Sequence, residues 1–519
     1  MRMLHVLRPL TTALVLTAAA APLAALSANL KRVGGVLGTS VTYQIQGDPG
    51  QLYFLIPSLS TGPVPLAIVD PLDTRFLDVG LDLSTLWKSG FLNGAGQASA
   101  VYALPADPTL HGIALYAQFV TLPGTGLLVD EISNRSSFML GLPQQSTFTV
   151  GAQPGTLDGH AQTLLNDGRV LQSGGSSEVA GTSVAQSGFR LFDPQTQSFS
   201  ATTGTMQHGR AGHAAVKLND GRVMLIGGGN DAGAIVASCD IWDPATGLCT
   251  PAAPMSTPRG QHTATLLPDG RVYVVGGLSL LNTADILATL NSALASTTIY
   301  NPATNTWSAG PNMPKPRVGH TATLLGNGQV LIAGGIELTN LIIIVVPDFS
   351  ADCRRYNPAT NTMSSAAAIP GARGLHAATR LSNGNAAIAG GVDGDPVLLS
   401  FTVLSSVRIY NATTNAWTSV ADMTNPRVYP VLHSTGGKLV ALGGLSTFDI
   451  ATTSGTPVQT IETAPETGAA WSAAGSLQLA RPLCVSTVIE GGQRILTTGS
   501  GDNGSGGTIP DQTADLYIP

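Results

Sequence analysis

Residues 258–277 read PRGQHTATLLPDGRVYVVGG, and residues 316–335 repeat them as PRVGHTATLLGNGQVLIAGG. Each copy holds two short apolar runs separated by a turn with Asp-Gly or Asn-Gly, and each ends in a glycine pair. Two apolar runs around such a turn predict a β-hairpin. Because this pattern recurs from residue 160 to the end of the chain, it decides the fold.

The repeat begins seven times, at intervals of 49 to 58 residues. Its first position is occupied by His160, His213, His262, His320, His376, Pro430 and Cys484. The second run ends in Gly174-Gly175, Gly227-Gly228, Gly276-Gly277, Gly334-Gly335, Gly390-Gly391 and Gly443-Gly444, and in Gly499-Ser500-Gly501 in the seventh unit. A second hairpin follows, with a turn such as Asn301-Pro302 and an aromatic residue such as Trp307 beyond it. Two hairpins make a four-stranded antiparallel sheet, the size of a propeller blade.

The glycine pair, the aromatic residue before Asp/Asn-Pro and the later Trp resemble the kelch motif. The resemblance covers residues 147–519 and implies a seven-bladed β-propeller. Residues 29–146 lack the repeat and contain short strand-like segments between Pro and Gly turns, which favours a small β-sandwich. We therefore predict an all-β chain in which a seven-bladed kelch-type β-propeller is preceded by a small β-sandwich.

The seventh unit lacks its fourth strand, because the sequence ends at Pro519. Phe148 lies 12 residues before His160, close to the 13 residues between Trp307 and His320. We expect residues 147–153 to supply the missing outer strand, since pairing the start of the propeller with its end removes an exposed sheet edge.

The charge of the chain argues against nucleic-acid binding. The net charge is −6, charged residues make up 11% of the chain and no Lys/Arg cluster exists.

The first residues indicate the compartment. Residues 1–28 are typical of a secretory signal peptide, with Arg2 and Arg8 flanking the n-region and an apolar run that ends in small residues. The alternative is a membrane anchor, but Pro22 breaks the run, which is shorter than a bilayer requires. We expect a secreted or extracytoplasmic protein, in the periplasm or at the cell surface, without a transmembrane anchor.

Export permits disulfides, and four cysteines are present. Cys239 and Cys249 flank the turn at Asp243–Gly247, and we predict a disulfide between them. The alternative is two buried thiols on neighbouring strands. Cys353 and Cys484 lie in distant repeats, and we expect them to stay unpaired.

An arginine lies three residues before the first position of each unit from the second onward, namely Arg210, Arg259, Arg317, Arg373, Arg427 and Arg481. Six guanidiniums near the axis can hold an anionic sugar or a carboxylate by bidentate bonding. The alternative is that each arginine satisfies carbonyl groups between adjacent blades.

The recurring histidines suggest a ring of metal ligands. Equivalent positions in seven blades, however, lie too far apart to share one ion, so we predict hydrogen-bonded core histidines and no metal.

The connection between the second and third strands varies in length, whereas the other connections are short or uniform. Variation is thus concentrated on one face of the propeller, which we take as the candidate binding surface. The alternative is neutral drift in loop length. One such connection carries the apolar run Leu341–Val346, which predicts either a contact patch or a strand that is extended at its end and packed on its neighbour.

The chain also resembles the copper-radical oxidases, which combine a sandwich with a seven-bladed kelch propeller. Their copper site uses an adjacent Tyr-His pair, but none of the ten tyrosines here is followed by His, so we assign no copper ligand and no cofactor. We predict an exported, non-catalytic protein that recognises a glycan or a protein through the variable face. The alternative is a carbohydrate-active enzyme, either a galactose-oxidase-like oxidase or an acidic-sugar mutarotase.

Overall fold

The computed structural model describes residues 28–122, 126–151, 157–179, 182–230, 232–282, 285–341, 344–395, 400–449, 455–499, 501–502, 508–509 and 514–519. The signal peptide predicted for residues 1–28 therefore lies outside the described residues, apart from Ala28. The chain divides into two compact units. One holds the described residues up to Lys31 with Tyr43–Ala100 and Ala117–Arg135, and the other holds Arg32–Thr42, Val101–Tyr116 and Ser136–Pro519.

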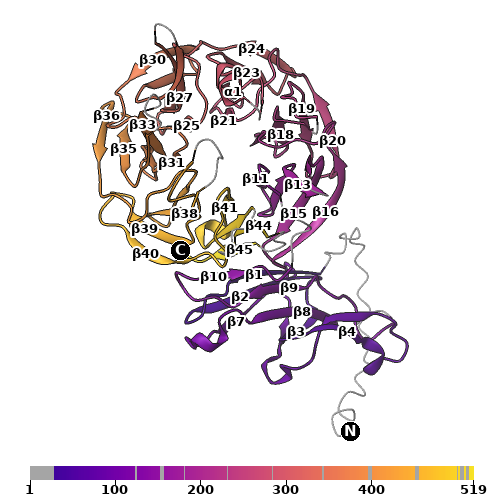
Figure 1. Ribbon diagram of the computed structural model, residues 1–519. Helices are drawn as coiled ribbons and strands as arrows, with labels where there is room; N and C mark the ends of the chain where they lie inside the picture. Colours follow the sequence, from indigo (N-terminus) through magenta and orange to yellow (C-terminus); the bar gives the residue numbers. More distant parts are fainter. Residues whose placement is uncertain are drawn as a thin grey trace. The chain divides into compact units, whose positions relative to one another are not determined.

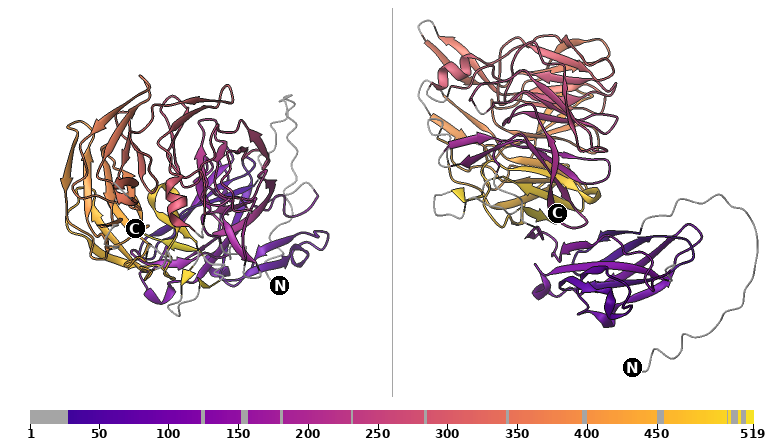
Figure 2. Two further views of the ribbon diagram at one scale, coloured as in Figure 1. Left: turned by 45° about the horizontal axis from the view of Figure 1, so that its top comes forward. Right: turned by 90° about the vertical axis from the view of Figure 1, so that its right-hand side faces the viewer.

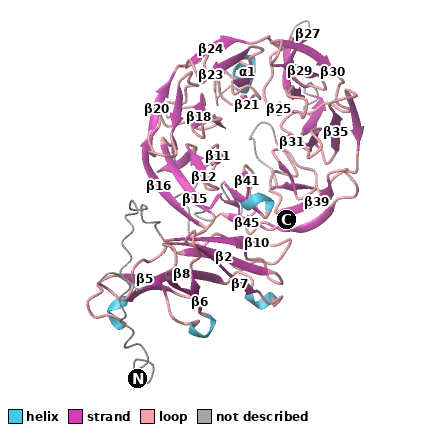
Figure 3. Ribbon diagram, turned by 180° about the vertical axis from the view of Figure 1, so that it is seen from behind, coloured by secondary structure: helices cyan, strands magenta, loops and turns pink. Residues whose placement is uncertain are grey.

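Strands dominate the described part of the N-terminal region (Figure 3). One sheet has the order β1-β2-β7 (Asn29–Gly34, Ser40–Gln46, Gln97–Ala103), another has the order β6-β3-β8-β9 (Lys88–Phe91, Leu52–Ser58, Ala114–Leu122, Ser136–Met139), and β4 (Thr61–Pro65) pairs with β5 (Phe76–Val79). In β2 every second residue, Val41, Tyr43 and Ile45, is buried, as expected for a strand with one face in a core. The N-terminal region also holds the short 3₁₀ helices η1 (Leu66–Ile68), η2 (Ser84–Leu86) and η3 (Pro108–Leu110). A further one, η4 (Glu490–Gly492), lies near the end of the chain. The sheets agree with the small β-sandwich predicted from the sequence.

Seven four-stranded antiparallel sheets of described residues form the blades of a propeller (Figure 1). Blade 1 is β11, β12, β15 and β16 (Ala161–Leu164, Val170–Ser173, Gly188–Asp193, Ser198–Thr205), blade 2 is β17 to β20 (Ala214–Lys217, Val223–Ile226, Cys239–Trp242, Cys249–Ala252) and blade 3 is β21 to β24 (Thr263–Leu266, Val272–Val275, Thr297–Asn301, Thr306–Ala309). Blade 4 is β25, β26, β29 and β30 (Thr321–Leu324, Val330–Ala333, Cys353–Asn357, Thr362–Ala366) and blade 5 is β31, β32, β35 and β36 (Ala377–Arg380, Ala386–Ala389, Val407–Asn411, Ala416–Ser419). Blade 6 is β37 to β40 (Val431–Thr435, Lys438–Leu442, Thr460–Pro465, Ser472–Ser476), and blade 7 is β41, β42, β45 and β10 (Val485–Ile489, Arg494–Thr498, Asp515–Tyr517, Ser146–Phe148).

The last blade closes the ring with a strand from the start of the propeller. Strand β10 pairs antiparallel with β45, and Thr147 lies opposite Leu516. A side-chain hydrogen bond also joins the two ends of the ring, because His160 Nε2 of blade 1 lies 2.6 Å from Thr498 Oγ1 of blade 7. Closure removes the edge that an unfinished seventh sheet would expose.

The second strand of a blade is buried on both faces. In β22 all four residues, Val272 to Val275, are completely buried. Val272 and Val274 pack with the core of blade 2, whereas Tyr273 and Val275 pack with that of blade 4. A strand enclosed between two neighbouring sheets reads as a continuous apolar run rather than an alternating one, which explains the Val-Tyr-Val-Val sequence.

The glycine pair is required by the close approach of the next blade. Gly227 has φ +59°, and a Cβ at this position would lie 2.2 Å from the carbonyl oxygen of Arg259. The amide of Gly228, at φ +97°, donates a hydrogen bond of 2.8 Å to the same oxygen. Glycine is needed here both for the left-handed backbone and for the space.

The connections between second and third strands carry additional structure on one face. They form the hairpins β13–β14 (Ser176–Val179, Thr182–Ala185), β27–β28 (Ile336–Leu341, Ile344–Phe349), β33–β34 (Val392–Asp395, Ser400–Val403) and β43–β44 (Gly501–Asp502, Thr508–Ile509), and the helix α1 (Ile286–Asn291). Figure 2 (right) shows α1 and hairpins projecting from one face of the propeller. Of the run Leu341–Val346, Leu341 ends β27 opposite Ile344, and residues 344–346 lie in β28, whereas residues 342 and 343 lie outside the described residues.

We predict that Gly227→Ala lowers the free energy of unfolding by at least about 2 kcal/mol, because it adds a clash with Arg259 to the cost of the left-handed backbone. Gly247→Ala is the matched control, since Gly247 has φ +70° but nothing within 4 Å of the added Cβ. It should lose only about 1 kcal/mol, the backbone cost alone. Urea denaturation of both variants measures the difference, and equal losses would show that the contact between blades is unimportant.

Candidate functional site

The six recurring arginines are buried and bound to the backbone. Their exposed fractions are 0 to 2%. Nη1 of each arginine donates to the carbonyl of the first glycine in its own blade, pairing Arg210 with Gly227, Arg259 with Gly276, Arg317 with Gly334, Arg373 with Gly390, Arg427 with Gly443 and Arg481 with Gly499. The carbonyl of each arginine accepts from the second glycine of the preceding blade in all six cases. These contacts fit the carbonyl-satisfying role and not an open ring of six guanidiniums, because the side chains point into the blades.

The blades differ in how they neutralise this buried charge. Arg210 is paired with Asp240, Arg427 with Glu462 and Arg481 with Asp515, all of them almost fully buried. Arg317 lies 2.8 Å from both Glu337 and Asp352. Arg373 has no carboxylate at ion-pair distance among the described residues, but Asp393 and Asp422 act on its charge.

Blade 3 lacks the carboxylate. The position of Asp240, Glu462 and Asp515 in their blades is occupied by Thr298 in this one. Arg259 donates to Ser296 Oγ at 2.7 Å and to two carbonyls, but no described carboxylate lies at ion-pair distance from it. Burial without a counter-ion lowers the pKa of Arg259 to about 10.

A cavity adjoins Arg259. It has a volume of about 330 Å³, and its polar walls come from Ser256, Ser296, Thr298, Ser308 and Asn312. Trp307 forms an apolar wall and is fixed in place, because its Nε1 donates to Ala253 O of blade 2 at 2.7 Å. None of these five polar residues or Trp307 was a site residue predicted from the sequence. Aligning the third strands would have shown an acid in blades 2, 6 and 7, an arginine in blades 1, 4 and 5, and a threonine, Thr298, only in blade 3.

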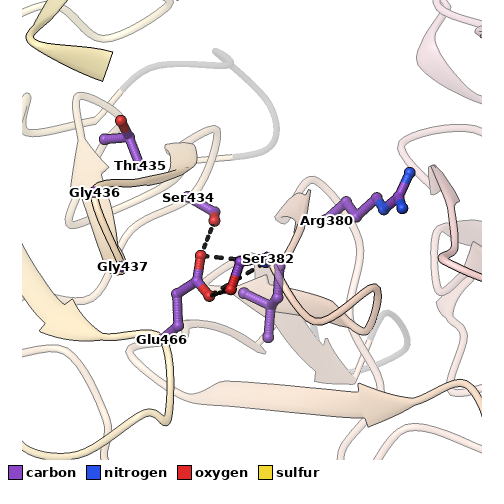
Figure 4. A pocket seen from close by; sticks show the side chains of 8 residues that line it. Arg380, Ser382, Ser434, Thr435, Gly436, Gly437 and Glu466 are labelled. Atoms are coloured by element: carbon purple, nitrogen blue, oxygen red, sulfur yellow. Dashed lines mark hydrogen bonds between the residues drawn. The ribbon is translucent and has the colours of Figure 1, made fainter. Parts of the chain in front are cut away.

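A second cavity, of about 440 Å³, lies at the turns of blades 5 and 6 (Figure 4). Glu466 accepts hydrogen bonds there from the hydroxyls of Ser382 and Ser434. Burial raises the pKa of Glu466, but these hydrogen bonds outweigh it and lower the pKa overall. Arg380 extends away from Glu466 in Figure 4. The acceptor capacity of Glu466 is used by the two blades themselves, so we read this cluster as a link between them.

Four of the five recurring histidines, His160, His213, His320 and His376, bond to a neighbouring blade, whereas neither ring nitrogen of His262 has a hydrogen-bond partner among the described residues. His320 Nε2 lies 3.1 Å from Thr263 Oγ1, and His376 Nε2 lies 2.9 Å from Thr321 Oγ1. Burial lowers the pKa of His213, His262, His320 and His376 to about 3 and that of His160 to about 4. They are therefore neutral core residues at pH 7. No three His, Cys, Asp or Glu side chains gather as metal ligands in the part of the chain that the structure describes.

The predicted Cys239–Cys249 disulfide is wrong, and all four cysteines are free thiols. Cys239 lies opposite Ala252 and Cys249 opposite Trp242, so the two cysteines are three residues out of register. Cys239 packs in the core between blades 2 and 3, whereas Cys249 packs against the core between blades 1 and 2. Side chains three residues apart in register face opposite sides of a sheet and cannot form a disulfide. Burial raises the pKa of both thiols to about 12.

Comparisons with known proteins agree with this geometry. The family model described as Kelch motif matches residues 258–314. An F-box/kelch-repeat protein of Arabidopsis thaliana is 30% identical over 145 residues, and Kelch-like protein 36 of Rattus norvegicus is 27% identical over 156 residues. These matches cover 28% and 30% of this chain and only 35% and 24% of those proteins.

Two solved structures resemble the chain. A fungal alcohol oxidase of the AA5 family, in complex with copper, has a TM-score of 0.55 and 17% identity, with 71% of this chain and 75% of that chain covered. The structure of YjhT has a TM-score of 0.46 and 13% identity, with 62% of this chain and 98% of that chain covered. The propeller is thus of the kelch type and resembles that of galactose-oxidase-like proteins in fold. No helix among the described residues is long and apolar enough to cross a bilayer.

We predict that Glu462→Gln destabilises the fold by about 3 to 5 kcal/mol, because it leaves the Arg427 charge buried without its partner. Asp220→Asn serves as the control. Asp220 is 47% exposed and lies 2.7 Å from the 39% exposed Arg222, so its loss should change the free energy of unfolding by less than about 1 kcal/mol. Chemical denaturation at pH 7 tests both, and a small effect of Glu462→Gln would contradict a structural role for the arginines.

We further predict that the free energy of unfolding falls as the pH is lowered from 7 to 5. The folded pKa values of the core histidines lie below the ordinary value of 6.5, so the unfolded chain binds more protons throughout this window. His320→Gln should reduce the slope by at most about 1.4 kcal/mol per pH unit. An unaltered slope in His320→Gln would mean that His320 binds the same number of protons in the folded and unfolded states, which contradicts a lowered folded pKa.

Proposed function

We propose that this chain is an exported, non-catalytic binding protein that recognises a glycan or a protein through the propeller face formed by the connections between second and third strands. The observation that carries the proposal is the contrast between the two faces. One face has short, uniform turns, while the other carries α1 and four hairpins of unequal length. Varied loops on a rigid scaffold are where recognition commonly resides.

These connections are packed together rather than loose. Buried residues from blades 3 to 6 form one apolar cluster, made of Leu278, Leu290, Val318, Ile336, Phe349, Val392, Val428 and Leu445. Phe349 and Phe401 add an edge-to-face contact between neighbouring hairpins. A shared core of this kind holds the face in one conformation, which lowers the entropic cost of binding.

The connection in blade 3 presents apolar side chains to solvent. Leu280, Leu281 and Leu287 are 46%, 40% and 46% exposed. The backbone beneath them is held by Thr289, whose hydroxyl accepts from Asn282 N at 2.8 Å and donates to Asn282 O at 2.9 Å. Exposed leucines on an ordered loop favour a contact surface. A kelch propeller suits a binding role. The similarity to the alcohol oxidase is a similarity of fold alone.

We predict that a triple variant, Leu280→Ser with Leu281→Ser and Leu287→Ser, lowers ligand capture at least tenfold. The mature chain is screened against an array of neutral and acidic glycans and extracellular proteins, with copper content determined on the same sample. Binding that the triple variant loses, without stoichiometric copper, supports the proposal.

The control is Leu248→Ser, because Leu248 is 54% exposed but lies in the turn between third and fourth strands on the opposite face. It should leave capture unchanged. Equal losses in both variants would place recognition elsewhere. Oxidation or isomerisation of an array sugar by the purified chain would contradict a non-catalytic role.

A further inference from the structure

Three blades fill the space beside their arginine with a carboxylate and an amide. In blade 2, Asp240 binds Arg210 and also accepts from Gln207 Nε2 at 3.1 Å. In blade 6, Glu462 binds Arg427 and accepts from Asn425 Nδ2 at 3.0 Å.

Blade 7 repeats the arrangement with different atoms. Asp515 Oδ2 accepts from Arg481 Nε at 2.7 Å, and its other oxygen accepts from the backbone amide of Gln478 at 2.6 Å. The three blades show that this pocket of the fold accommodates a carboxylate directly against the guanidinium, on either its Nε or its Nη2 side.

Blade 3 lacks both partners. Thr298 stands in the position of Asp240, and Ser256 stands in the position of Gln207. The two shorter side chains leave the cavity of about 330 Å³ beside Arg259. Arg259 is 2% exposed, and its Nη2, the atom that binds the acid in blades 2 and 6, donates among the described residues only to Ser296 Oγ. A buried guanidinium with an open N–H edge and no counter-ion is a site for an anion.

The other walls define what accompanies the anion. Ser296, Thr298 and Ser308 bring hydroxyl groups, and Asn312 brings an amide, so the ligand carries several groups that donate and accept hydrogen bonds. Trp307 offers an aromatic wall, which suits the C–H face of a sugar ring. The volume matches the smallest ligand pockets and limits the occupant to about one monosaccharide.

We infer that the cavity between Arg259 and Trp307 binds a hexuronic acid, free or at the end of a glycan, whose carboxylate replaces the acidic side chain that blades 2, 6 and 7 supply. Ser296 ends the connection that carries Leu280, Leu281 and Leu287, so the site lies at the proposed recognition face. The inference deepens the proposed function by naming the ligand class.

The test is titration calorimetry of the full mature chain with glucuronate, galacturonate, glucose and acetate. A uronate should bind at least tenfold more tightly than glucose, which lacks the carboxylate, and than acetate, which lacks the ring. Binding of glucose equal to that of the uronates would overturn the role of Arg259, and equal binding of acetate would overturn the sugar assignment.

Variants that rebuild blade 2 inside blade 3 make the test specific. Thr298→Asp, alone or with Ser256→Gln, should abolish uronate binding and raise the melting temperature, because the protein then supplies its own carboxylate. Thr298→Ser is the matched control, since it keeps the hydroxyl and the space, and should bind as the parent does. Uronate binding that survives Thr298→Asp would overturn the inference.

The two proposals fail separately. If the array finds a ligand whose capture depends on the three leucines while no uronate binds, the recognition face stands and the hexuronic-acid site does not. If a uronate binds in a Thr298-dependent manner but the leucine variant captures the array ligand as well as the parent, the site stands and the wider face does not.

Discussion

The carbonyl oxygen of one arginine in each blade from the second onward is the contact on which the ring depends. It accepts a hydrogen bond from the second glycine of the preceding blade, while the arginine side chain bonds to the first glycine of its own blade. The backbone can approach this closely only where no Cβ intervenes, which explains the glycine pair. The same arginine therefore joins two blades and places a positive charge inside the fold.

A buried charge has to be compensated, and the blades do so in different ways. Blades 2, 6 and 7 use a single acid on the third strand, blade 4 uses Glu337 and Asp352, and blade 3 uses only hydroxyls and carbonyls. A repeat that preserves the arginine but varies the acid keeps the architecture while leaving Arg259 without a carboxylate partner. Ligand binding can arise there without any change in the fold.

Recognition and stability are thus separated within each blade. The glycines, arginines and histidines join neighbouring sheets, and the second connections are free to vary because they only have to cover the shared apolar cluster. The exposed leucines near α1 and the cavity beside Arg259 belong to the same blade and to the same end of it. A ligand that contacts both would be held by an apolar surface and by one charge.

The sequence alone determined the kelch-type propeller and its seven blades, because six units repeat the glycine pair, the seventh keeps Gly499 and Gly501, and such patterns are local. It also allowed both roles considered for the arginines, the binding of an anion and the satisfaction of carbonyl groups between adjacent blades. Tertiary structure decided between them, since burial and partners depend on residues such as Asp240 and Thr298 that lie far from the arginine in sequence. It decided against the disulfide for a similar reason: hairpin register sets which face each cysteine occupies, and spacing along the chain does not. The cavity beside Arg259 exists only because two side chains from separate segments are both short.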